Sequence, residues 1–161
     1  MKSIREHNAP KNNTSPYNVE DVGNEIVNNP VAFKAYQRIN DQGYDVRINY
    51  DIPDEINDAG VTRRGEKNVD IWQMNNWNKE QAVGTMVHES THIEYRHQKR
   101  RQYNSQYEEY RAFVREELYY RSKNPNKQTR PTMKKRRQIW EDVKERYPLL
   151  PQGKYPFGGN K

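Results

Sequence analysis

Cysteine is absent from the chain, and this excludes disulfide bonds and any metal site built on thiolates. Long apolar runs are also missing. No stretch could supply a membrane span or the hydrophobic region of a signal peptide. We therefore expect no membrane span. If the protein is exported, we expect another segment or a dedicated machine to deliver it.

Apolar residues are scarce as well. They make up 32% of the 161 residues, and the mean hydropathy is −1.40. Twelve Tyr and three Trp compensate in part, because aromatic side chains bury large areas. We expect one small domain over residues 18–147, with a flexible N-terminal arm at 1–17 and an extended C-terminal tail at 148–161.

The most informative stretch is residues 78–97, which are predicted to form a helix. Asn78 is a suitable N-cap, Gln81 stands at the capping-box position, and no proline interrupts the segment. Apolar residues recur with helical spacing at Ala82, Val83, Met86, Val87 and Ile93. Gly84 is a weak helix former but does not break the pattern.

This predicted helix carries the pattern H-E-x-x-H as His88-Glu89-Ser90-Thr91-His92. Residues four apart lie on one helix face, so both imidazoles can reach one metal ion. Glu89 follows the first histidine directly. It can take a proton from a metal-activated water without binding the metal itself.

The stretch resembles the active-site helix of zincin metallopeptidases. Five positions around the histidines agree with the wider zincin pattern: Thr85, Met86, Ser90, Thr91 and Ile93. Glu94 departs from it, because zincins usually place an apolar residue there. The resemblance implies a zinc metallopeptidase, with a Zn²⁺ cofactor and a protein or peptide substrate.

A catalytic zinc needs a third protein ligand. In one zincin branch it is a histidine six residues after the second, but position 98 is Gln, and His97 has the wrong helical phase. In the gluzincins it is a glutamate on the next helix. The predicted helix 105–120 offers Glu108, Glu109, Glu116 and Glu117.

Glu109 is the preferred candidate. Together with Ala112 it forms Glu-x-x-Ala, which resembles the ligand helix of small gluzincins. Glu108 is the main alternative, although its carboxylate also suits the helix N-terminus. The resemblance thus implies His88, His92 and Glu109 as zinc ligands and Glu89 as general base. Because Phe113 replaces a residue that orients a ligand histidine in some gluzincins, we expect that support from elsewhere. No tyrosine stands out as an oxyanion donor; Tyr103 and Tyr107 are merely near in sequence.

The remaining pattern predicts an α+β fold. Residues 44–52 alternate as in a strand, with every second residue from Tyr44 to Ile52 on its buried face. Residues 61–64 and 68–74 are predicted to form further strands. Helices are expected at 18–27, 30–42 and 131–147. We expect a zincin-like domain with a short, mostly antiparallel sheet packed on the active-site helix and the following ligand helix, and a further helix at the C-terminus. By resemblance, the substrate would lie along residues 68–74 as the sheet edge.

This compact layout also resembles the minimal metallopeptidase modules of bacterial polymorphic toxins. That resemblance implies delivery into a target cell by a secretion system and a cognate immunity protein; otherwise the protein would be cytoplasmic.

The alternative is a basic nucleic-acid-binding or nuclease-type effector in which H-E-x-x-H is coincidental or structural. The net charge is +6, and basic clusters occur at 99–101 and 134–137, with Tyr103 and Trp140 nearby. A third alternative is an interaction module with an inactive metal site.

Overall fold

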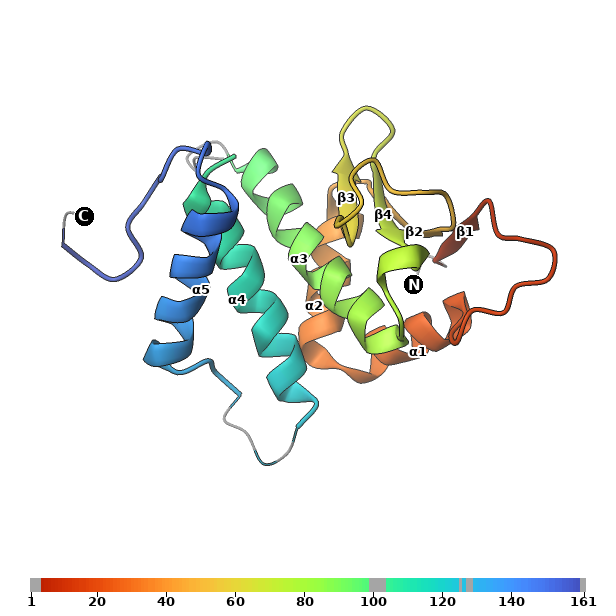
Figure 1. The fold of residues 1–161 in the computed structure, drawn as a ribbon. Helices are drawn as coiled ribbons and strands as arrows, with labels where there is room; N and C mark the ends of the chain where they lie inside the picture. The colour runs from red at the N-terminus through yellow and green to blue at the C-terminus, as the bar shows by residue number, and fades with distance from the viewer. Residues whose placement is uncertain (1–3, 99–103, 125, 127–128, 160–161) are drawn as a thin grey trace.

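The structure is a computed structural model, and it describes residues 4–98, 104–124, 126 and 129–159. These residues form an α+β domain of five α-helices and a four-stranded sheet (Figure 1). The helices are α1 (Val19–Asn28), α2 (Pro30–Asp41), α3 (Lys79–His97), α4 (Gln106–Ser122) and α5 (Met133–Arg146). The strands are β1 (Arg5–His7), β2 (Asp45–Asn49), β3 (Gly60–Arg63) and β4 (Asn68–Trp72).

The sheet has the order β1-β2-β4-β3 and is mixed. Strands β1 and β2 pair in parallel, as do β2 and β4, and only β3 and β4 are antiparallel. The expectation of a mostly antiparallel sheet was therefore wrong. After β2, the chain passes to the far edge as β3 and returns as β4 in the interior, so β2 and β4 run in the same direction. Local sequence patterns do not encode that order.

The N-terminal segment differs from the expected arm. Strand β1 extends the sheet beside β2, and the flanking residues Ile4 and Tyr17 are only 6% and 3% exposed. Burial of these two side chains fixes both ends of a segment that is polar on average.

Helices α1, α2 and α3 begin where their capping residues predict. Asn18 and Asp21 form a reciprocal capping box at α1, and Asn29 accepts backbone hydrogen bonds at the start of α2, where Pro30 occupies the first turn. Together with the sheet, these helices enclose the main hydrophobic core, which includes Ile26, Ile39, Ile48 and Met86. The buried face predicted for residues 44–52 ends early, because Ile52 is exposed.

A second, smaller cluster joins α4 to α5 around Tyr110, Ile139 and Trp140. The C-terminal segment packs against it through Tyr155 and Phe157. Backbone amides at the start of α4 also donate to carbonyls of residues 151 and 152. The expected extended tail is thus attached to α4 along part of its length.

Among the described helices, none has both the length and the apolar character that a bilayer crossing needs.

Candidate metal centre

Helix α3 places His88, Glu89 and His92 together. The side chain of Asn78 accepts from the Gln81 backbone amide at 2.8 Å, which sets the helix start where the capping pattern predicts. The two imidazole centroids lie 5.1 Å apart. Ligand-type atoms of all three residues lie within 4.8 Å of one another, so this group could hold a metal ion.

Helix α4 brings Glu109 against both histidines. Its Oε2 lies 3.3 Å from His88 Nε2, and its Oε1 lies 3.5 Å from His92 Nε2. Zinc bonds of about 2.0–2.1 Å at tetrahedral angles place neighbouring ligand atoms roughly 3.4 Å apart. Both distances from the imidazoles to Glu109 are close to this separation, one at each carboxylate oxygen.

Glu89 and Glu109 differ in how their oxygens are satisfied. Glu89 Oε2 accepts a 2.6 Å hydrogen bond from the Thr62 hydroxyl, whereas the buried Glu109 Oε2 makes no hydrogen bond of good geometry with the described residues and has only the ion-pair contact with His88 at 3.3 Å. A buried carboxylate oxygen that lacks a donor is costly unless a cation neutralises it. Of the two acids, Glu109 is therefore the better third ligand, and that role stays a prediction.

Two further carboxylates contact the opposite sides of the imidazole rings. Glu108 Oε1 lies 2.7 Å from His92 Nδ1, and Glu116 Oε2 lies 3.2 Å from His88 Nδ1. A carboxylate at Nδ1 holds that nitrogen protonated and leaves Nε2 free to bind a metal. The two candidate ligand histidines thus have carboxylate partners at Nδ1, which the side chain of Phe113 could not supply.

The four glutamate candidates of α4 thus separate by position. Glu109 faces the Nε2 atoms, Glu108 and Glu116 face the Nδ1 atoms, and Glu117 pairs with Arg121 at 2.9 Å. Sequence analysis did not assign Glu108 and Glu116 to this orienting role. The spacing of Glu116, seven residues or two turns after Glu109, places both on one face and was the available signal.

The surrounding carboxylates favour positive charge between them. Burial lowers the pKa of His88, but Glu109, Glu116 and Glu89 outweigh burial and raise it to about 10. For Glu109, burial alone would raise the pKa, but His88 and His92 outweigh burial and hold the pKa below its usual value. The centre is therefore electrostatically suited to a cation, whether protons or a metal.

The neighbourhood of Glu89 corrects the predicted sheet edge. Strand β4 lies inside the sheet, between β2 and β3, so residues 68–74 cannot offer a free edge. Strand β3 is the edge strand beside the centre, and its Thr62 binds Glu89. A Cβ at Gly60 would stand 3.3 Å from Glu89 Cγ, so glycine permits this close approach.

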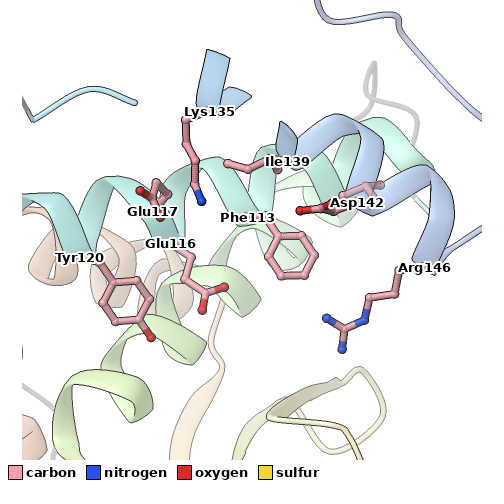
Figure 2. A pocket seen from close by; sticks show the side chains of 9 residues that line it. Phe113, Glu116, Glu117, Tyr120, Lys135, Ile139, Asp142 and Arg146 are labelled. Atoms are coloured by element: carbon pink, nitrogen blue, oxygen red, sulfur yellow. The ribbon is translucent and has the colours of Figure 1, made fainter. Parts of the chain in front are cut away.

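A cleft of about 280 Å³ opens beside these residues. Its lining includes His88 and Glu89 from α3, Phe113 and Glu116 from α4, and Gly60, Arg146 and Tyr147 from outside these helices. Figure 2 shows Phe113, Glu116 and Arg146 again in the neighbouring cavity between α4 and α5, which shares them. The cleft and this cavity are therefore adjacent parts of one concave surface.

Tyr147 is a cleft residue that sequence analysis missed. Burial, with Glu109 and Glu89 nearby, raises its pKa to about 12, so the phenol stays protonated and can donate. Of the tyrosines considered from the sequence, Tyr107 packs against Tyr95 and Tyr110, and Tyr103 lies outside the described residues. Tyr147 lies 55 residues beyond His92 in the sequence, and no local pattern connects them.

The side chain of Glu94, which departs from the zincin pattern, forms ion pairs with arginines of the neighbouring helices. It pairs with Arg115 of α4 and lies 3.6 Å from the Arg38 guanidinium of α2. A carboxylate at this position joins three helices through charge.

The side chains of the basic cluster 134–137 do not all lie on one surface. Within 134–137, Lys135 lines the cavity between α4 and α5, whereas Arg137 stacks 4.6 Å from the Phe157 ring centroid. The other cluster, 99–101, lies outside the described residues.

Comparisons of the chain with protein-family models, curated proteins and solved structures gave no match.

Proposed function

We propose that the protein is a zinc-dependent metallopeptidase with His88, His92 and Glu109 as ligands and Glu89 as general base. The observation that carries the proposal is the arrangement around the two imidazoles. Both Nε2 atoms face one partly buried carboxylate, and each Nδ1 atom has a separate carboxylate partner. Metal-binding histidines are typically held in this way.

The bound zinc would polarise a water molecule and lower its pKa toward neutrality. Glu89 would accept the proton and pass it to the leaving amine, and the Thr62 hydroxyl would hold its carboxylate in position. Tyr147 and Arg146, which line the same cleft, would donate to the oxygen on which negative charge develops.

An extended peptide would lie along the free edge of β3. This strand is at the sheet edge and contacts the helix that carries Glu89. Unpaired backbone groups at a sheet edge can bind an extended chain by strand addition, which needs no particular side chains.

Glu89→Gln tests the proposed base. The zinc-loaded variant should retain its metal but cleave a peptide library at least 100-fold more slowly than the wild-type protein, as mass spectrometry would measure. Glu80→Gln, on the first turn of the same helix, is the matched control and should leave cleavage unchanged. Equal cleavage by Glu89→Gln would remove the assigned role.

The biological setting follows only from the resemblance to polymorphic toxin modules. We propose a toxin that acts on a protein of the target cell and is neutralised by an immunity protein. Expression in a bacterial cytoplasm should arrest growth for the wild-type chain but not for Glu89→Gln. Growth arrest by both proteins would mean that toxicity does not depend on hydrolysis by Glu89.

A further inference from the structure

A second concave site lies on the side of α4 away from the metal centre. Glu109, Phe113 and Glu116 occupy one face of the helix, whereas Arg111 and Arg115 lie on the other, since successive residues turn by 100°. A cavity of about 610 Å³ opens at this second face, between α2, α4 and the start of α5. Its apolar lining includes Val31, Val87, Val114 and Leu118.

The polar lining of this cavity is almost entirely cationic. Among the residues that the structure describes, six cationic side chains line it and no carboxylate does. They are Lys34, Arg38, Arg111, Arg115, Arg130 and Arg136. They come from α2, α4, α5 and the segment before α5, so the charges converge from separate elements.

Most of these cations have no compensating charge among the residues that the structure describes. Arg38 and Arg115 share the single carboxylate of Glu94, as described above. The other four have no carboxylate within ion-pair distance in the described part of the chain. The Nε atom of Arg136 is buried and has no hydrogen-bond partner within residues 4–98, 104–124, 126 and 129–159.

The arginines are also crowded. Burial, with Arg115 and Arg111 nearby, lowers the pKa of Arg38 to about 10, although Glu94 opposes this. Uncompensated like charges destabilise the folded chain, and a bound anion would relieve that repulsion.

We propose that this cavity binds a compact anion that carries two or more phosphate groups. Guanidinium groups match phosphate oxygens in pairs, and the number of cations exceeds what one phosphate needs. The volume lies within the usual range for small-ligand sites. Nucleic acid would instead require an open basic stripe. On α5, Arg137 does not extend the row of cations in the cavity, because it stacks on Phe157 outside it.

The proposal is independent of the zinc chemistry and is tested by calorimetric titration of the purified chain with tripolyphosphate. We compare the wild type with Arg111→Gln/Arg136→Gln and with the control Lys134→Gln/Arg137→Gln. Both double variants lower the net charge equally. We expect micromolar affinity in the wild type, at least a tenfold loss in the cavity variant, and less than a twofold change in the control. Chelation of metal by the probe would be the same in all three proteins.

Absence of binding to the wild type, or equal weakening by both double variants, would overturn the proposal. The exposed pair Lys34→Gln/Arg130→Gln removes charge from the cavity without touching its buried part, so it guards against misfolding and should also weaken binding. A single-stranded oligonucleotide could bind more tightly than tripolyphosphate, with its binding weakened by both the cavity variant and the control Lys134→Gln/Arg137→Gln. That result would assign the basic surface to nucleic acid and overturn the proposal.

Discussion

Each imidazole of the candidate centre has a different carboxylate at each ring nitrogen. For His88 these are Glu109 at Nε2 and Glu116 at Nδ1, and for His92 they are Glu109 and Glu108. The two kinds of carboxylate have different consequences when they are changed. Loss of a ligand removes a metal bond, whereas loss of an orienting group leaves the ligand free to rotate.

The roles of Glu109 and Glu116 can be distinguished by the zinc affinity of the variants that lack each carboxylate. We expect Glu109→Gln to lose stoichiometric zinc, because only two protein ligands remain. Glu116→Gln should still bind zinc but about 10- to 100-fold more weakly, as measured by competition with a chelator. A larger loss for Glu116→Gln than for Glu109→Gln would reverse the two assignments.

The sequence predicts those residues of the candidate centre that lie close together on one helix. His88, Glu89 and His92 follow from a fixed spacing on α3, and the resemblance to the gluzincin ligand helix favours Glu109 over Glu108. Tyr147 could not be predicted, because it reaches the cleft only through the packing of α5 on α4. Zinc binding and hydrolysis themselves remain predictions.

At the level of elements, the crossing of α3 and α4 depends on a small residue. A Cβ at Gly84 would stand 2.6 Å from Tyr120 Cζ, so the Tyr120 ring would have to shift. Glycine, which weakened the helix prediction, is therefore what lets the helix that carries Glu109 approach the histidines.

Gly84→Ala should destabilise the protein despite the better helix propensity of alanine. Propensity favours alanine by about 1 kcal/mol, but overpacking costs about 1–3 kcal/mol. In a Tyr120→Ala background the clash is gone, and the same change should stabilise the fold. Urea unfolding of the four proteins gives the answer, and a stabilising Gly84→Ala in the wild-type background would mean that Tyr120 moves aside without cost.

The sheet is held by a buried acidic residue as well as by apolar contacts. Asp70 of β4 is fully buried; Arg63 Nε donates to it at 2.8 Å and Arg47 pairs with it from β2. Burial raises the pKa of Asp70, but hydrogen bonds from Arg47 and Arg63 outweigh burial and hold it below its usual value. This carboxylate joins three neighbouring strands.

The depressed pKa of Asp70 predicts a pH-dependent stability. A group with a lowered folded-state pKa stabilises the fold above its unfolded pKa, and this contribution is lost as pH falls through the folded pKa. Asp70→Asn should cost about 3 kcal/mol at pH 7, and the difference from wild type should shrink below about pH 4. Asp54→Asn, which removes an exposed partner of Arg63, should cost less than about 0.5 kcal/mol. A pH-independent cost for Asp70→Asn would contradict this account.

Strand positions were easier to predict than their order. The segments 44–52 and 68–74 contain β2 and β4, and 61–64 overlaps β3 with a shift of one residue, because alternation and turn residues are local signals. Their pairing depends on the whole chain. Strand β1 was missed because three residues among polar neighbours carry no periodic signal.

At the level of the whole molecule, a bound zinc would connect the two hydrophobic clusters. The histidines belong to α3 in the main core, and Glu109 belongs to α4, which also packs on α5. A ligand that binds only the folded state stabilises it by about 4 kcal/mol at a concentration 1,000 times its Kd.

Zinc should therefore raise the melting temperature of the wild-type protein by roughly 10 °C at such a concentration. The same addition should leave His92→Ala unchanged, and EDTA should reverse the shift in the wild type. Differential scanning calorimetry measures this without a substrate. Equal shifts in both proteins would indicate zinc binding elsewhere.

The metal content of the purified protein shows whether α3 and α4 together form a zinc site. After reconstitution and desalting, we expect one zinc per chain in the wild type and in His97→Ala, whose histidine is on the same helix but contacts Tyr44 instead of the centre. We expect none in His88→Ala. Zinc that is absent from the wild type, or equal in all three proteins, would contradict the account.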